Sequence, residues 1–274
     1  MNKINEIIES MQDEIIESLQ KLLRIKSIIS FTEPLMPFGK SVNDALMFII
    51  NLSSKLGFEA YNLDGYAGYL DYGNGEDMVA AFTHLDVVPE GAGWECDPFE
   101  GIISEGKIFA RGVVDNKGPL IATLYGLKAL KEAQLNISKK IRLFFGTNEE
   151  SGFNDVRYYL EKDKQIPSAG FTPDSHFPVV YAEKGVVTFD VVKKFCTGKK
   201  ALIDIISIRG GNAPNSVPDY CECLIKTKSV VKEKHIIELL NNCVNKKNNW
   251  LGYKNSPQGL IIWSKGKTAH AAMP

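Results

Sequence analysis

The chain has 274 residues, of which 44% are hydrophobic and 24% are charged, and its formal net charge is −1. This length allows one large domain or two ordinary ones, and the composition is typical of a globular protein. Basic and acidic residues nearly balance, and no apolar run reaches the roughly 18 residues of a membrane span. We therefore expect no nucleic-acid partner and no membrane partner.

The first 27 residues predict an amphipathic helix, because their apolar residues recur at spacings of three and four. The segment is charged throughout, unlike a signal peptide. The five cysteines form no CxxC pair, which favours reduced thiols in a cytoplasmic protein. Cys221 and Cys223 fall on one face of an expected strand. They could hold a metal, but two small core residues are the favoured interpretation.

Short apolar segments alternate with helical ones over the next part of the chain. A second helix is expected from Lys40 to Leu56, ended by Gly57. Strands are expected at 58–63, 68–72, 78–83, 107–110 and 140–145, with a helix at 118–135. This alternation predicts an α/β fold with a mainly parallel mixed sheet and helices on both of its faces.

The pattern changes after residue 185. Segments 186–195, 201–211 and 219–227 alternate apolar and polar residues, as antiparallel strands do. A helix at 230–244 and a strand at 259–267 follow. We therefore predict a first domain over residues 1–186 and a second, α+β domain over residues 187–274.

Polar residues follow three of the expected strands in the first domain. His84 and Asp86 end one strand, Glu149 and Glu150 follow another, and Asp174 follows a third apolar segment. In open α/β sheets, ligands lie beyond the carboxyl ends of the strands. Clustered carboxylates repel one another unless a cation lies among them, and nitrogen and oxygen ligands suit zinc, manganese or cobalt. The sequence therefore predicts a divalent metal site.

Spacing suggests how two pairs of these residues divide their work. Asp86 projects to the same side as His84, so its carboxylate could accept the second N–H of the imidazole. Glu149 and Glu150 are adjacent and point apart, so one could bind metal while the other acts as a general base. Each motif alone is more often structural, and it is their clustering that favours a metal site.

Four segments resemble the co-catalytic metallopeptidases of the M20 family, and bacterial dipeptidases of the PepV type above all. They are THLDVVPEGAGWECDPFEG, GKIFARGVVDNKGP, FFGTNEESG and FTPDSHFP, in this order. GGNAPNSVPDYC and GKTAHAAMP resemble two signatures of the family's lid domain. The resemblance implies a catalytic domain over residues 1–186 and an incomplete lid domain over residues 187–274.

The resemblance also implies two divalent metal ions, zinc first, with manganese or cobalt as alternatives. His84 and Asp174 would hold one ion and Glu150 the other, and Asp115 would bridge them. The peptide bond between Asp115 and Asn116 would be cis.

The remaining family roles concern catalysis and substrate. Asp86 would orient the histidine ligand, and Glu149 would deprotonate the attacking water. His270, in the lid domain, would stabilise the negative charge that develops on the substrate carbonyl oxygen. Asn215 would contact the substrate backbone.

The expected reaction is hydrolysis of the amide bond of dipeptides, β-alanyl dipeptides or short peptides. An N-acyl-amino-acid deacylase or desuccinylase of the same family is the nearest alternative, and a non-catalytic homologue is another. Family members continue beyond Pro274 and supply a further histidine to the second ion. We therefore expect an incomplete second site, little peptidase activity for residues 1–274 alone, and self-association through apolar surface left exposed.

Overall fold

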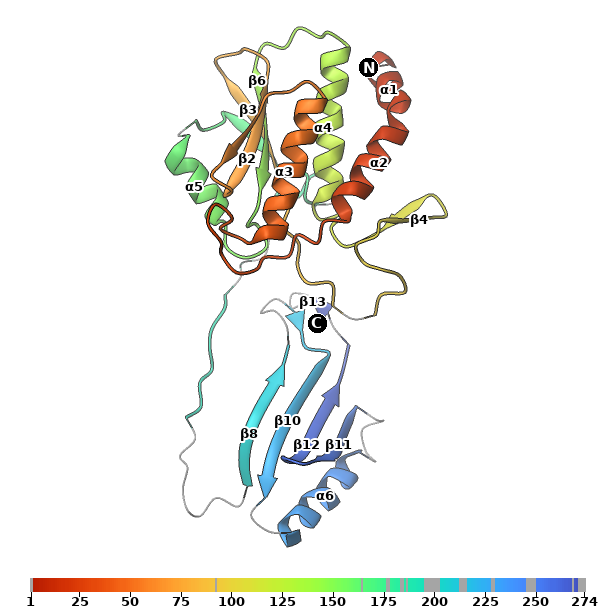
Figure 1. The fold of residues 1–274 in the computed structure, drawn as a ribbon, viewed down its shortest axis with the longest axis vertical. Helices are drawn as coiled ribbons and strands as arrows, with labels where there is room; N and C mark the ends of the chain where they lie inside the picture. Colours follow the sequence, from red (N-terminus) through yellow and green to blue (C-terminus); the bar gives the residue numbers. More distant parts are fainter. Residues whose placement is uncertain are drawn as a thin grey trace. The chain divides into compact units, whose positions relative to one another are not determined.

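The computed structural model divides the chain into two compact units, Met1–Ala182 and Glu183–Pro274, and each is described by itself (Figure 1). This division lies close to the boundary expected after residue 186. The structure describes residues 2–91, 93–163, 165–175, 178–182, 185, 187–194, 203–211, 216–227, 230–244, 250–267 and 269–270.

The first unit alternates strands with helices. In chain order its elements are α1 (Asn2–Ser10), α2 (Gln12–Leu23), α3 (Lys40–Lys55), β1 (Ala60–Leu63), β2 (Ala67–Tyr72), β3 (Met78–His84), β4 (Ile102–Ser104), β5 (Lys107–Phe109), α4 (Lys117–Glu132), β6 (Lys140–Gly146), α5 (Asn154–Lys162) and β7 (Ala169–Phe171). The short β4 and β5 form a separate antiparallel ribbon.

Five of these strands form one mixed sheet in the order β1-β2-β6-β3-β7. β3 pairs in parallel with β6 on one side and with β7 on the other, whereas β1 and β2 are antiparallel to their neighbours. The expected α/β fold with a mixed sheet is therefore confirmed, and its parallel part consists of β6, β3 and β7.

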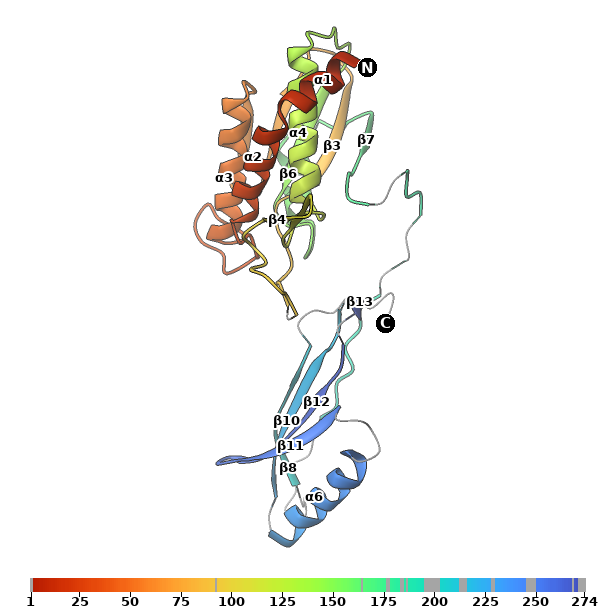
Figure 2. The same cartoon turned by 90° about the vertical axis from the view of Figure 1, so that its right-hand side faces the viewer.

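Helices cover both faces of this sheet. Figures 1 and 2 show α1 to α4 together on one face, and Figure 1 shows α5 on the other. Adjacent residues of β6 point to opposite faces, as strand geometry requires. Phe145 joins the large core formed with α1 to α4, whereas Phe144 packs with Ala67 and with Tyr159 of α5. The charged residues that follow the strands therefore stand on a rigid platform buried on both sides.

Two details differ from the sequence-based expectations. The first helix is interrupted at Met11, whose φ of −98° and ψ of 5° separate α1 from α2. The helix α5 was not expected, because its sequence is mostly polar and only Asp155 and Tyr159 of its nine residues are buried. Among the described residues, no helix is long and apolar enough to cross a membrane.

The second unit is an antiparallel sheet in the order β11-β12-β10-β8, with one helix. Its elements are β8 (Ile203–Gly210), β9 (Ser216–Val217), β10 (Tyr220–Thr227), α6 (Val230–Val244), β11 (Leu251–Ser256), β12 (Gly259–Lys265) and β13 (Ala269–His270). β11 was not expected. The expected strand at 186–195 is wrong over its described part, since residues 187–194 take no part in a ladder. An alternating pattern gives a strand its faces but does not supply the neighbour with which it must pair.

Candidate metal centre

Three strand ends of the first unit meet at one edge of its sheet. β3 ends at His84, β6 at Gly146 and β7 at Phe171. His84 lies directly opposite Gly146 in the ladder, and Leu85 N donates to Gly146 O at 2.9 Å. Because parallel strands end at the same edge, the loops after them bring their polar residues to one place.

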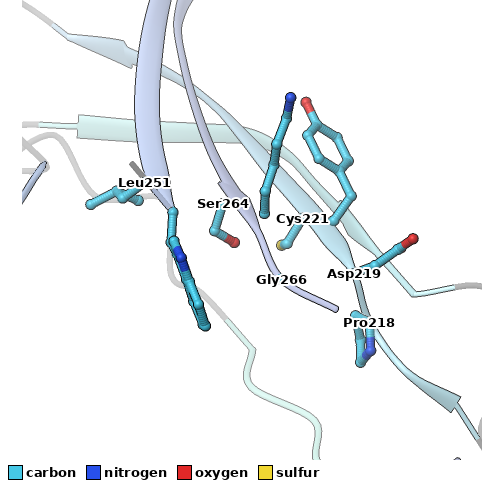
Figure 3. A pocket seen from close by; sticks show the side chains of 9 residues that line it. Pro218, Asp219, Cys221, Leu251, Ser264 and Gly266 are labelled. Atoms are coloured by element: carbon cyan, nitrogen blue, oxygen red, sulfur yellow. The ribbon is translucent and has the colours of Figure 1, made fainter. Parts of the chain in front are cut away.

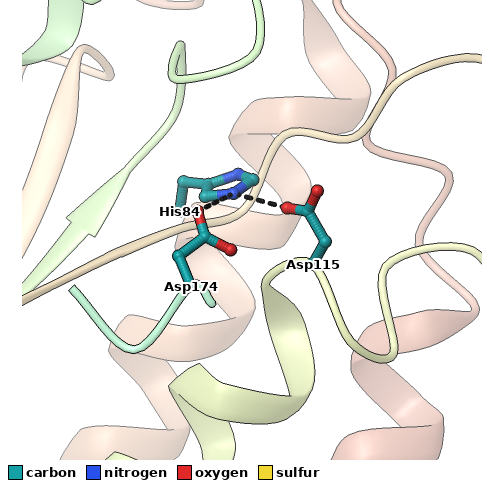
Figure 4. A group of neighbouring side chains, drawn as sticks. All are labelled: His84, Asp115 and Asp174. Carbon is teal, nitrogen blue, oxygen red and sulfur yellow. Dashed lines mark ion pairs between the residues drawn. The ribbon is translucent and has the colours of Figure 1, made fainter. Parts of the chain in front are cut away.

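His84 stands at the centre of a group of three donors. Its Nε2 atom lies 2.9 Å from Asp115 Oδ1 and 3.4 Å from Asp174 Oδ2 (Figure 4). One ligand atom from each residue lies within 4.8 Å of the other two. Asp115 comes from the turn before α4, and its peptide bond to Asn116 is cis, as the resemblance implied. Asp174 comes from the loop after β7, so the structure brings together residues that are far apart in the sequence.

Asn116 and Asp86, both fully buried, make hydrogen bonds that orient members of this group. Asn116 Nδ2 donates to Asp174 Oδ1 at 3.0 Å, and Asn116 Oδ1 accepts from His84 N at 3.3 Å. His84 Nδ1 lies 2.9 Å from the backbone oxygen of Asp86 and 3.4 Å from its Oδ1. The sequence suggested the carboxylate as partner, whereas the backbone oxygen is the nearer one. A proton on Nδ1 points to that oxygen, which leaves Nε2 to face the other carboxylates.

Glu149 and Glu150 lie in the turn after β6, beside the group of three. Glu149 Oε2 is 3.9 Å from His84 Nε2. Burial, followed by the charge of Asp115, raises the pKa of Glu150 to about 7. Burial also raises the pKa of Glu149; the charge of His84 opposes this shift and that of Asp174 adds to it. Glu150 is not one of the three donors within 4.8 Å, so the structure places it near the group but outside it.

The donor set fits a divalent cation. His84 Nε2 is buried and makes no hydrogen bond with acceptable geometry, although two carboxylates stand close to it. Burial alone would lower the pKa of His84, but the surrounding carboxylates, first those of Asp115 and Asp174, outweigh burial and raise it to about 12. A proton on the imidazole therefore compensates for an excess of negative charge, which is the compensation that a metal ion would give instead. One imidazole and several carboxylates form a ligand set that suits zinc and tolerates manganese or cobalt.

Two predicted site residues belong to the second unit. Asn215 lies outside the described residues. The backbone of His270 pairs with Ser216 in the short ladder between β13 and β9, and its side chain is outside the described part of the structure. Their expected roles toward substrate stay predictions.

A hollow of about 490 Å³ opens in the second unit beside β10, β11 and β12 (Figure 3). Cys221 lines it together with Leu251 and Ser264. Cys221 and Cys223 are both half-buried. Among the described residues, the groups of three or more potential metal ligands include neither of them. The favoured interpretation of these cysteines, as packing residues and not ligands, stays a prediction.

Sequence reasoning gave no role to three buried polar residues that support the site. Asn116 and Lys117 both lie in the quoted segment GVVDNKG. Lys117 Nζ donates to Leu22 O at 3.2 Å and to Ile25 O at 2.7 Å, and burial lowers its pKa to about 7. Asp155, in the first turn of α5, accepts backbone hydrogen bonds from the turn that carries the two glutamates. The acidic first turn of an otherwise weak helix was the available signal for Asp155.

Comparison with known proteins shows the family of the chain. The family model of peptidase family M20/M25/M40 matches residues 80–238, which is more than half of the chain. Two bacterial proteins that both carry the name "Putative dipeptidase" are similar in sequence. YtjP of Bacillus subtilis (strain 168) is 39% identical over 231 residues, which cover 82% of this chain and 49% of that protein. A protein of Staphylococcus epidermidis is 34% identical over 270 residues, which cover 96% of this chain and 56% of that protein.

Solved structures share the fold. Human carnosine dipeptidase 1 superposes with a TM-score of 0.56 at 22% identity, covering 64% of this chain and 41% of that one. An M20 family metallo-carboxypeptidase from Sulfolobus solfataricus gives a TM-score of 0.50 at 25% identity, covering 58% of this chain and 37% of that one.

An α/β sheet whose parallel strand ends gather a histidine and carboxylates defines the class as an α/β protein with a candidate metal centre. The chain belongs to peptidase family M20/M25/M40. It spans about half the length of the curated relatives that it matches.

Proposed function

We propose that the protein is a metal-dependent hydrolase that cleaves the amide bond of dipeptides, including β-alanyl dipeptides, or short peptides. The observation that carries the proposal is the buried Nε2 of His84, which faces Asp115 and Asp174 without a hydrogen bond. The dipeptidase names of the relatives at 39% and 34% identity support the choice of substrate.

The proposed centre holds two divalent ions, zinc being the first candidate. His84 and Asp174 would bind one ion and Glu150 the other, with Asp115 between them. Divalent ions at this place would lower the pKa of a water molecule and polarise the scissile carbonyl group. The close approach of Asp115 and Asp174 to one imidazole supports the first of the two positions.

Glu149 is the proposed general base. It is near His84 but is less closely engaged than Asp115, and burial keeps its pKa above the ordinary range of a glutamate. A carboxylate of raised pKa is better able to take a proton from the attacking water and pass it to the leaving amine. His270 and Asn215 are proposed to contact the substrate.

Metal analysis and turnover test this proposal together. Purified residues 1–274 should bind a stoichiometric divalent ion, counted by native mass spectrometry with zinc, manganese or cobalt. We keep the prediction that this chain alone turns over little substrate. Co-expression with the C-terminal half of the Bacillus subtilis relative should give hydrolysis of a dipeptide panel, with N-acetyl and N-succinyl amino acids left intact. Cleavage of the N-acyl substrates instead would favour the deacylase, and metal binding without any turnover would favour a non-catalytic homologue.

Paired variants of the two glutamates separate their roles. In the co-expressed form, E149A should lower the turnover number by about 10²- to 10⁴-fold, as loss of a general base does, with metal content nearly unchanged. E150A should lose metal as well as turnover. Equal metal loss in both variants would reject this division between base and ligand.

A further inference from the structure

Four consecutive backbone N–H groups in the turn after β6 donate to two buried carboxylates. Thr147 N and Asn148 N donate to Asp155 Oδ2 at 2.8 and 3.0 Å. Glu149 N and Glu150 N donate to Asp86 Oδ1 and Oδ2, both at 3.1 Å. The two carboxylates therefore divide the four N–H groups between them, two each.

Both acceptors are shielded from solvent and close to the metal centre. Asp86 is 0% exposed and follows β3, two residues after His84; Asp155 is 1% exposed and lies in the first turn of α5. Gly146 makes the approach of Asp155 possible, because a Cβ atom at this position would lie 2.9 Å from Asp155 Oδ2 and 2.9 Å from Thr83 O. The carboxylate of Asp155 is thus packed against the ends of β6 and β3.

Asp155 serves its own helix in one way, because it is the acidic residue of the first turn of α5. Its Oδ1 accepts from Val156 N at 2.8 Å, but among the described residues no basic side chain forms an ion pair with it. Burial raises its pKa even though three N–H groups donate to it. A buried carboxylate without a cationic partner is costly, and its contact with the first turn of the helix does not account for it by itself. The other oxygen of the Asp155 carboxylate accepts the two hydrogen bonds that hold the turn after β6.

We propose that Asp155 is a positioning residue of the metal centre. Together with Asp86 it fixes the backbone of residues 147–150, so that the carboxyl groups of Glu149 and Glu150 stand beside the group formed by His84, Asp115 and Asp174. This inference rests on the proposed function, since it assigns the turn its task at the metal. Charge-assisted hydrogen bonds to four successive amides give the turn one geometry before any ion or substrate arrives.

The test compares D155N with D163N. Asp163 caps the other end of α5, and its carboxylate pairs with Arg142, so both variants remove one largely buried negative charge from the same helix. The first measurement is amide hydrogen exchange of residues 147–150 in metal-free protein. The second is the affinity for zinc. In D155N we expect exchange of these amides to be about tenfold faster and zinc binding to be about tenfold weaker, at the lower end of the 10- to 100-fold loss typical of residues that orient ligands.

D163N should lower the melting temperature and leave both measurements at the wild-type value. The proposal is overturned if D155N matches D163N in amide exchange and in zinc affinity, because Asp155 would then act on stability alone. If D155N does not fold, D155S, which keeps an oxygen acceptor on a smaller side chain, takes its place in both measurements. A wild-type protein that binds no ion would reject the proposed function, and the metal-free exchange comparison would then decide by itself whether Asp155 holds the turn.

Discussion

Two clusters of charged side chains in the first unit each surround a buried side chain, Arg142 or His84, and they differ in how completely their members satisfy one another. The Arg142 cluster consists of Arg142, Asp71, Tyr159, Asp163 and Gln165. Its guanidinium donates to both oxygens of Asp71 at 2.7 Å, to Tyr159 Oη at 2.8 Å and to Asp163 Oδ2. The ring of Tyr69 lies against the guanidinium, 3.8 Å from its carbon to the ring centroid. All the polar contacts of this cluster are internal to the unit.

The His84 cluster, formed by His84, Asp115 and Asp174, is open by comparison. Its buried Nε2 has no hydrogen bond, and the side chain of Asp115 is 60% exposed. Asp86, Glu149 and Glu150 add further negative charge around it.

The difference shows why buried charge alone does not identify a site. The planar guanidinium of Arg142 donates several charge-assisted hydrogen bonds at once. Its buried ion pairs therefore have a structural role. His84 is surrounded by more acceptors than it can satisfy, and part of the cluster faces solvent. An excess of carboxylates around one buried nitrogen that makes no hydrogen bond favours a cation from outside the chain.

The largest effect should come from removing the histidine at the centre of the open cluster. H84A should weaken zinc binding by more than about 100-fold, the upper end of what loss of an orienting residue costs, because it removes a ligand. Isothermal titration calorimetry measures the affinity. H235A is the matched control, since the His235 side chain is 71% exposed on α6. Zinc affinity in H84A equal to that of H235A would show that the two clusters do not differ in the way described.

The next largest effect is expected at the Arg142 cluster, and it should fall on the free energy of unfolding. R142M leaves Asp71 and Asp163 without their shared cation, and breaking a buried ion pair in this way costs about 3–5 kcal/mol in the free energy of unfolding. Urea denaturation measures that loss. K140M is the control on the same strand, since Lys140 Nζ lies 3.8 Å from Asp71 Oδ2 in a more exposed pair and should contribute under about 1 kcal/mol. Zinc affinity should be unchanged in both variants; a loss of affinity in R142M would mean that the clusters are coupled.

A smaller effect is expected behind the open cluster, at Asn116. N116A removes the amide that joins His84 N to Asp174 Oδ1, so both ligands lose part of their orientation. We expect zinc binding to weaken by about 10- to 100-fold. N62A, at an exposed amide of β1 that accepts from Gly65 N, controls for the loss of an amide elsewhere in the sheet. Wild-type zinc affinity in N116A would show that Asp115 and Asp174 are placed by their own loops.

The His84 cluster was more predictable from sequence than the Arg142 cluster. The apolar segments before His84 and Glu149 predicted β3 and β6, and parallel strands end at a common edge, so the meeting of His84 with Asp174 followed from topology. The role of Asp115 came from the family resemblance. Hydrophobic periodicity does not reveal partners such as Asn116, because its contacts are 32 and 58 residues away in the chain.

The Arg142 cluster illustrates the limit in the opposite direction. Arg142 lies in the middle of an apolar strand, and its partners come from β2 and from the end of α5, a helix whose sequence is mostly polar. The division at Met11 was likewise hidden, since the same apolar pattern continues through α1 and α2. Local pattern predicts which face of an element is buried, but the break in a helix and the partner of a charge depend on tertiary packing.

The smallest effect concerns the pH dependence of the free energy of unfolding, and it tests the Arg142 cluster through Tyr69. Burial, followed by the charge of Asp163, raises the pKa of Tyr69 to about 12, although the charge of Arg142 opposes the shift. The unfolded chain releases the phenolic proton near pH 10, so between pH 10 and pH 12 the unfolded state holds fewer protons than the folded state. The free energy of unfolding should therefore fall as the pH rises through this range. Y69F removes the titrating group, and its free energy of unfolding should fall less steeply, as followed by urea denaturation at each pH.

Y125F provides the comparison, because the pKa of Tyr125 is also about 12 but its hydroxyl contacts Ser18 and Glu14, away from Arg142. Combining each substitution with D163N separates the two tyrosines: D163N removes one source of the shift at Tyr69 and none at Tyr125. Loss of Asp163 should therefore reduce the effect of Y69F on the pH dependence of the free energy of unfolding and leave the effect of Y125F unchanged. Equal behaviour of the two tyrosines would show that the charges of the Arg142 cluster do not shift the pKa of Tyr69.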